Sequence, residues 1–116
     1  MTIKPISESD FQSQIMELAV YCGYRVHHQR PAKTSQGWRT AISGDKGFPD
    51  LVLAKPGVLL VPELKRSAKE KPSDDQQLWM AAIHGNRAIS ECWRPEDWSR
   101  IQELIMTNGV SHQWTK

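Results

Sequence analysis

The sequence predicts an α/β fold in which helices flank a small mixed β-sheet, with its elements in the order α-β-β-β-α-β-α. Two apolar segments on either side of the turn KPG, residues 55–57, favour a pair of central strands. Apolar residues at helical spacing before and after this pair favour helices that cover it. The chain of 116 residues suits a single domain, with a core over about 7–106 and a tail over 107–116 that no pattern places.

The first predicted helix begins at Ser7 or Ser9, because either hydroxyl can cap it and because Glu8 and Asp10 lie near its positive end. Its apolar positions are spaced as in a helix that ends at Gly23, and they are Phe11, Ile15, Leu18, Ala19 and Cys22. This helix is therefore expected to pack one face against the sheet.

The next segment, residues 24–46, is predicted to be a short strand, YRVHH, followed by a loop from residue 29 onwards. Within the loop, Trp38 and Ile42 favour a short strand or the arm of a hairpin. Basic residues outnumber acidic ones within residues 25–46, where Arg25, Arg30, Lys33, Arg39 and Lys46 stand against Asp45. Such a segment can meet phosphates, or it can be an ordinary solvated loop.

The central strands are predicted over DLVLA, residues 50–54, and GVLLVPEL, residues 57–64. Both are nearly continuous apolar runs, which is typical of strands covered on two faces. A charged loop follows, and Ser73 then caps a second helix that ends at GN. The apolar face of that helix is expected to be Leu78, Trp79, Ala82 and Ile83. A last strand over RAISECW and a third helix, from RPEDW to about Met106, complete the chain.

Composition limits the possible functions. Hydrophobic residues make up 39% of the chain, charged residues 24%, and the net charge is only +2, which does not by itself indicate a nucleic-acid partner. The chain has no apolar run that could span a membrane and no apolar signal core at its start, so we expect a cytoplasmic protein. Cys22 and Cys92 are expected to be free thiols, and together with His27 and His28 they fit no zinc-site spacing.

Charged residues stand at the open end of the predicted hairpin. Asp50 starts the first strand, while Glu63 and Lys65 end the second and share a face because they are two residues apart. Two nearby carboxylates favour a cation, and Asp50, Glu63 and the backbone carbonyl of Leu64 would form a partial cage for Mg²⁺. Lys65 could then orient a water or stabilise charge on a phosphate. The alternative is an ion pair at a strand end without catalysis.

These residues resemble a known group of enzymes. PD followed by a hairpin and ELK resembles the PD-(D/E)XK nuclease superfamily. Together with Glu8 and Gln12, the segments GFPDLVL, ELK and SDDQQLW resemble its VRR-NUC branch, over roughly residues 7–98. The resemblance implies a restriction-endonuclease-like fold and one VRR-NUC-like nuclease domain over residues 1–116. The branch includes small stand-alone proteins of bacteria and phages, so the implied location is the cytoplasm of a bacterial host cell.

The resemblance also implies roles for individual residues. Asp50 and Glu63 would bind Mg²⁺ or Mn²⁺, and Lys65 would be the catalytic lysine. Glu8 would complete or support the metal site, and Gln76 would be the polar residue of the second helix that faces it. An alternative stays open for each of the last two roles: Glu17 in place of Glu8, and Gln77 in place of Gln76.

One residue departs from the expected pattern. Pro62 precedes Glu63 in a strand that should be central, and proline donates no ladder hydrogen bond. We therefore expect either a bend in the strand or a position where the missing amide faces no partner.

No segment of the sequence is suited to reading bases in a groove, so a nuclease of this kind should select DNA by its structure. The family implies branched DNA, such as four-way (Holliday) junctions or flaps, and two symmetric cuts would require a homodimer. Trp38 could stack on an exposed base, and His28 with Arg30 could touch a phosphate. The predicted DNA-binding residues are Arg30, Lys33, Arg39, Lys46, Arg66 and Lys69.

Two other functions remain open at this point. The chain could be a catalytically inactive DNA-binding module of the same fold, which would hold DNA through the basic loop. It could also be a structural or interaction protein that binds no nucleic acid. Cleavage that depends on metal separates the first alternative from a nuclease, and a salt-dependent association with DNA separates the second.

Overall fold

The computed structural model describes residues 6–29, 32–34, 37–39, 42–85 and 87–107, and for 32–34, 37–39 and 107 it describes the backbone alone. In chain order the elements are α1 (Glu8–Tyr21), β1 (Arg25–His28), β2 (Ala32–Thr34), β3 (Gly37–Arg39), β4 (Leu51–Lys55), β5 (Val58–Leu60), β6 (Glu63–Leu64), α2 (Asp74–Ile83), β7 (Cys92–Trp93), the 3₁₀ turn η1 (Pro95–Asp97) and α3 (Trp98–Thr107).

The central hairpin forms, but its second predicted strand, residues 57–64, is divided into β5 and β6 on either side of Val61 and Pro62. β4 and β5 pair antiparallel with Leu53 opposite Leu60, and β1 pairs antiparallel with the other side of β4, where His28 lies opposite Leu51. The sheet order is therefore β1-β4-β5. β2 and β3 form a separate hairpin within the predicted loop, with register partners that leave Ile42 outside it.

The segment from β5 to β6 lies between β4 and the chain around β7. The amide of Val61 donates to the carbonyl of Ile89 at 2.8 Å, and the amide of Lys65 donates to the carbonyl of Trp93 at 3.0 Å. β6 and β7 pair in parallel, with Glu63 opposite Cys92. The strands thus include both antiparallel and parallel pairs, as the predicted mixed sheet requires.

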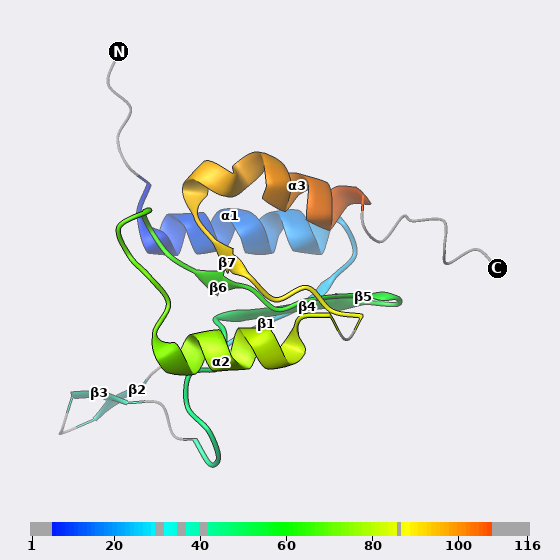
Figure 1. Ribbon diagram of the computed structural model, residues 1–116. Helices are drawn as coiled ribbons and strands as arrows, with labels where there is room; N and C mark the ends of the chain where they lie inside the picture. Colours follow the sequence, from blue (N-terminus) through cyan, green and yellow to red (C-terminus); the bar gives the residue numbers. More distant parts are fainter. Residues whose placement is uncertain (1–5, 30–31, 35–36, 40–41, 86, 108–116) are drawn as a thin grey trace.

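Helices cover the strands on both sides. α1 and α3 lie over one face and α2 lies over the other (Figure 1). The core between the strands and the helix pair is apolar, and its members include Phe11, Ile15, Ala19, Leu51, Leu53, Leu60, Leu64, Trp93, Ile101 and Ile105. Within the described part of the chain, no helix is both long enough and apolar enough to cross a bilayer.

Local signals fix where the helices begin. Ser7, rather than Ser9, caps α1 by accepting a hydrogen bond from the amide of Asp10 at 3.1 Å. Ser73 and Gln76 form a reciprocal capping box at α2, in which each side chain accepts from the backbone amide of the other. The side chain of Gln76 is therefore held at the start of α2.

The predicted apolar face of α2 is confirmed for Trp79 and Ile83, which are partly buried, and wrong for Leu78 and Ala82, which are exposed. Leu78 is 69% exposed, and the buried residue of the helix is Met80. The face that is at least half-buried runs through Gln76, Met80 and Ile83, at the spacing i, i+4, i+7. Because the polar Gln76 occupies one of these positions, the apolar pattern in the sequence shifted the predicted face towards Leu78 and Ala82.

The last strand is shorter than predicted, whereas η1 and α3 together cover the predicted third helix. The last strand covers only Cys92–Trp93, with an isolated bridge from Ile89 to Leu60. Arg87 has a φ of 62°, which no strand residue adopts. The third helix begins as a 3₁₀ turn before α3, because the Asp97 carboxylate accepts from the Arg94 amide at 2.9 Å and closes a tight first turn.

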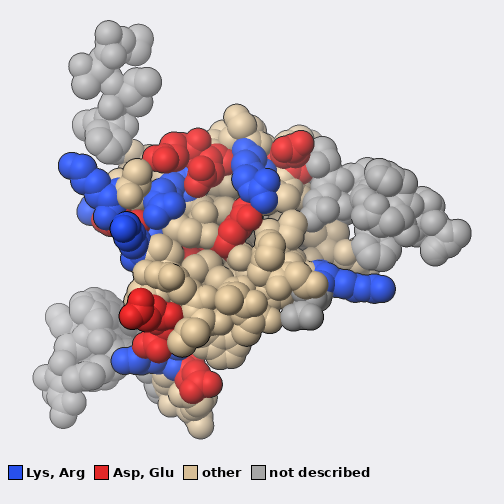
Figure 2. Space-filling model, viewed as in Figure 1, with Lys and Arg blue, Asp and Glu red and all other residues tan. Residues whose placement is uncertain are grey.

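Charged side chains are not spread evenly over the surface. Figure 2 shows Lys and Arg gathered at the edge where α1 begins and where the loop between β6 and α2 runs. Acidic side chains lie beside them and at the start of α2. This edge is also where β4 begins and where β6 ends, so the candidate site lies under it (Figure 1).

Candidate active site

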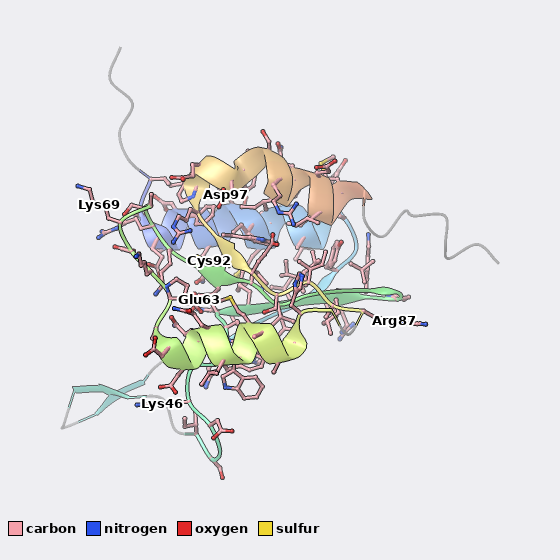
Figure 3. The ribbon with its side chains drawn as sticks, viewed as in Figure 1. Lys46, Glu63, Lys69, Arg87, Cys92 and Asp97 are labelled. Atoms are coloured by element: carbon pink, nitrogen blue, oxygen red, sulfur yellow. The ribbon has the colours of Figure 1, made fainter. Side chains whose placement is uncertain are left out.

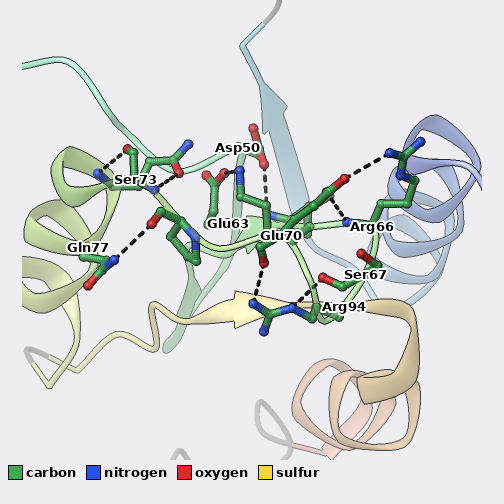
Figure 4. A network of polar contacts seen from close by, with 12 residues as sticks. Asp50, Glu63, Arg66, Ser67, Glu70, Ser73, Gln77 and Arg94 are labelled. Carbon is green, nitrogen blue, oxygen red and sulfur yellow. Dashed lines mark hydrogen bonds and ion pairs between the residues drawn. The ribbon is translucent and has the colours of Figure 1, made fainter.

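Pro62 explains how the site is built into the sheet. The amide of Leu51 donates to the carbonyl of Pro62 at 3.2 Å, but proline has no amide to return the bond. The next amide on that side of the strand belongs to Leu64, and it donates to Oδ2 of Asp50 at 2.8 Å (Figure 4). Backbone pairing to β4 therefore stops at Pro62, and a carboxylate takes the place of the next carbonyl.

Glu63 lies at the centre of the site and is 1% exposed. In Figure 3 it lies beside Cys92, above the start of α2. Its Oε2 is 3.4 Å from Nζ of Lys65, which extends from the same face of the strand. Its Oε1 is buried and has no hydrogen-bond partner among the described residues. A buried carboxylate oxygen of this kind is costly unless it is protonated or meets a cation or donor.

Glu63, Asp50 and Glu8 are close enough for the charge of Asp50 to shift the pKa of the other two. Burial, and next the charge of Asp50, raise the pKa of Glu63 to about 7, while Lys65 acts in the opposite direction. Burial, and next Asp50, also raise the pKa of Glu8, against the charges of Lys65 and Arg66. Glu8 at the start of α1 therefore shares a field with the hairpin carboxylates. Glu17, the alternative, lies more than two turns further along α1 and lines a neighbouring groove.

The donors present suit a hard cation with few protein ligands. Among the residues that the structure describes, no three His, Cys, Asp or Glu side chains are grouped to hold a metal ion. The candidate donor set is therefore Asp50, Glu63 and the carbonyl of Leu64, without Glu8 as a third side-chain ligand in this conformation. Mg²⁺ binds through one or two carboxylates and keeps several waters, so this set fits it. The unpartnered Oε1 of Glu63 supplies the open acceptor.

The two glutamines of α2 differ in their surroundings. Gln76 is half-buried and belongs to the capping box, whereas Gln77 is exposed and donates from Nε2 to the carbonyl of Pro72 at 3.0 Å. Of the two, Gln76 is the one on the half-buried face of α2.

The loop after β6 is held by a residue that the sequence did not single out. Nε of Arg94 donates to the carbonyl of Ser67 at 2.9 Å, and its Nη2 donates to the carbonyl of Glu70 at 2.8 Å (Figure 4). Arg66 and Glu70 form an ion pair of 3.0 Å within this loop. Cys92 was also missed as a neighbour of the site, although it lies opposite Glu63. The sequence offers no local signal for either contact.

Of the predicted DNA-binding residues, the structure describes the side chains of Lys46, Arg66 and Lys69. Lys69 and Lys46 lie on either side of Glu63 in Figure 3, and both are exposed. Lys46 is 3.7 Å from the Asp75 carboxylate, and Arg66 is paired with Glu70. Arg30 lies outside the described residues, as do the side chains of Lys33, Trp38 and Arg39.

Comparison with known proteins gives a likeness of fold. No protein-family model matches the chain, and no curated protein matches it. A solved structure described as a VRR_NUC domain protein has a TM-score of 0.61, with 88% of this chain and 90% of that chain covered and 18% of residues identical. At that identity the likeness establishes a shared fold. The chain therefore has the fold of a VRR_NUC domain protein, and its site carries two carboxylates and a lysine at one edge of the sheet.

Proposed function

We propose that this protein is a metal-dependent endonuclease of the VRR-NUC type that hydrolyses phosphodiester bonds in branched DNA. The observation that carries the proposal is the buried Glu63 carboxylate, whose Oε1 lacks a partner while Asp50 and Lys65 lie beside it. A structural ion pair would not need two carboxylates around one lysine. A fold shared with a VRR_NUC domain protein agrees with this chemistry.

Asp50, Glu63 and the Leu64 carbonyl would hold Mg²⁺ or Mn²⁺, with Glu8 as a supporting charge. When bound, such an ion polarises a phosphoryl oxygen and lowers the pKa of a bound water. The Leu64 amide fixes the Asp50 carboxylate, so one ligand is already oriented. Gln76 would add a polar group from the half-buried face of α2.

Lys65 would act directly on the reacting groups. Its Nζ lies 3.4 Å from Glu63, and its side chain is 21% exposed, so it is near the carboxylates and still reachable by substrate. From there the ammonium can orient the attacking water or stabilise charge that develops on the phosphate. Exposed Lys69 and Lys46, on either side of Glu63, would contact the DNA backbone.

Selection would follow DNA structure rather than sequence, with four-way junctions and flaps as the expected substrates. Two symmetric cuts in a junction need two sites, so we propose a homodimer acting in a bacterial cytoplasm.

Cleavage of labelled DNA tests the proposal. Junction, flap, single-stranded and duplex substrates would be incubated with Mg²⁺, Mn²⁺ or EDTA, with Lys65→Ala as the inactive variant. Arg25→Ala is the control, because Arg25 is exposed at the far end of β1, opposite Ala54. Metal-dependent cutting that Lys65→Ala loses and Arg25→Ala keeps supports the nuclease. Binding without cutting under any metal would favour an inactive DNA-binding module instead.

A further inference from the structure

A groove of about 380 Å³ lies at α1 and β1, and the described residues that line it are Gln12, Ser13, Met16, Glu17 and His28. His28 lies opposite Leu51, and Asp50 directly precedes Leu51. Gln12 lies one helical turn beyond Glu8 on the same side of α1. The groove therefore begins at the catalytic edge, yet the mechanism proposed above uses none of its residues.

A hydrogen bond fixes the chemistry of two of these side chains. Nε2 of Gln12 lies 3.3 Å from Nδ1 of His28. With the amide in this orientation its nitrogen donates, so Nδ1 accepts and a neutral His28 ring carries its proton on Nε2. The pair is left with the carbonyl oxygen of Gln12 as an acceptor and the Nε2–H of His28 as a donor. No described residue is recorded as a further partner of either atom.

The described lining favours a neutral, flat and polar ligand. None of the described residues that line the groove is lysine or arginine, and Glu17 contributes a carboxylate, which disfavours a phosphate there. Met16 offers a soft apolar surface, which suits the face of an aromatic ring. Every DNA base carries both donors and acceptors along its edge. A nucleobase satisfies each of these conditions.

We propose that this groove receives one unpaired DNA base next to the phosphate that is cut. The inference rests on the proposed nuclease function and supplies its means of selecting structure. In a duplex the hydrogen-bonding edge of a base is occupied by its partner, and extraction is least costly for a base that is already unpaired. Branch points and flaps provide such bases. Capture through one donor and one acceptor would tolerate any base sequence.

The ratio of cleavage on two substrates tests the groove. Gln12→Ala removes the hydrogen-bonded pair, and Gln14→Ala is the matched control, because Gln14 is exposed on the same helix and does not line the groove. kcat/KM would be measured on a flap and on fully paired duplex. We expect Gln12→Ala to lower the flap-to-duplex ratio about tenfold and Gln14→Ala to leave it unchanged. An unchanged ratio in Gln12→Ala, or an equal loss on both substrates, would overturn the proposal.

A measurement without catalysis separates this inference from the nuclease itself. Protein in EDTA would be mixed with flap DNA that carries 2-aminopurine at the branch or, as a control, within a paired arm. Capture should raise the fluorescence at the branch alone, and Gln12→Ala should abolish the rise. If the protein binds the DNA but the fluorescence at the branch does not rise, the proposed role of the groove is wrong and the proposed nuclease is unaffected. A rise with a protein that cuts no DNA overturns the nuclease alone, and a protein that neither binds flap DNA in EDTA nor cuts it with Mg²⁺ overturns both.

Discussion

Oδ2 of Asp50 accepts a hydrogen bond from the amide of Leu64 at 2.8 Å, in place of the backbone carbonyl that would continue the sheet. This bond occurs because Pro62, two residues earlier, ends backbone pairing to β4. The Asp50 carboxylate also raises the pKa of Glu63, which lies between Pro62 and Leu64 in the chain. Asp50 therefore both supplies a hydrogen-bond acceptor to the sheet and raises the pKa of a carboxyl group in the site.

The two roles of Asp50 can be separated by substitution. Asp50→Asn keeps an acceptor for the Leu64 amide and removes the charge, whereas Asp50→Ala leaves that amide without a partner. We expect Asp50→Ala to lose about 1–3 kcal/mol of unfolding free energy and Asp50→Asn to lose much less. Both should lose cleavage by at least about 100-fold, since each removes a metal ligand. Urea denaturation and the junction assay measure the two effects, and equal stability of the two variants would contradict the role in the sheet.

Glu63 should make stability depend on pH in metal-free protein. Its pKa is raised from its ordinary value of 4.5 to about 7 in the folded state, so the folded protein binds the proton more tightly. The unfolding free energy should therefore be highest below pH 4.5 and fall as the pH rises to about 7. Glu63→Gln has no proton to lose, and it should be more stable than the wild type at pH 8 by on the order of 2 kcal/mol.

Urea denaturation in EDTA at pH 5 and pH 8 measures this effect. Other carboxyl groups titrate in both proteins, so the difference between the wild type and Glu63→Gln isolates the contribution of Glu63. An equal change in unfolding free energy between the two pH values in both proteins would show that Glu63 does not carry the pH dependence. Adding Mn²⁺ at pH 8 should stabilise the wild type and have little effect on Glu63→Gln, because the ion neutralises the buried carboxylate.

The hairpin and its charges were predictable because their geometry is local. The tight turn at Pro56 and Gly57 sets the register of β4 and β5, and the period of two puts Glu63 and Lys65 on one face. The conflict at Pro62 was also visible in the sequence. The hydrogen bond from the Leu64 amide to the Asp50 side chain could not be predicted, because several acceptors could have met that amide.

Contacts between distant elements could not be predicted in the same way. Gln12 and His28 are 16 residues apart, and Arg94 reaches carbonyls 24 and 27 residues earlier in the chain. Neither contact lies within one helix or one hairpin, so the spacing of residues in the sequence does not predict it. Likewise, the sheet-facing side of α2 includes Gln76, which a search for apolar residues passes over.

Gly47 should be required where the chain passes the start of α2. It has a φ of 96°, and a Cβ there would lie 2.6 Å from Cβ of Asp75 and 2.9 Å from the amide nitrogen of Gln76. Gly44 has a φ of 101° but meets nothing within 4 Å. We expect Gly44→Ala to lose about 1–2 kcal/mol for its backbone conformation alone, and Gly47→Ala to lose about 1–3 kcal/mol more. Urea midpoints of the two variants give the comparison, and equal losses would rule out the close approach.

Arg94 should position the loop that follows the catalytic lysine. Its guanidinium joins the carbonyls of Ser67 and Glu70, and lysine cannot reproduce this fork although it keeps the charge. Arg94→Lys should therefore free the loop that carries Lys69 and raise KM for junction DNA about fivefold, since ordering the loop would then oppose binding. kcat should stay within about twofold of the wild type, because the amide of Lys65 remains bonded to the carbonyl of Trp93.

Arg100→Lys is the matched control for Arg94, since Arg100 makes an equivalent fork to the Glu91 carboxylate at 2.8 and 2.9 Å and touches no part of the loop. Its KM should equal that of the wild type. The salt dependence of binding should be similar in all three proteins, because no phosphate-contacting charge is removed. A loss of kcat with unchanged KM in Arg94→Lys would mean that the fork acts on Lys65 itself. Unchanged kinetics would mean that the loop keeps its position without the fork.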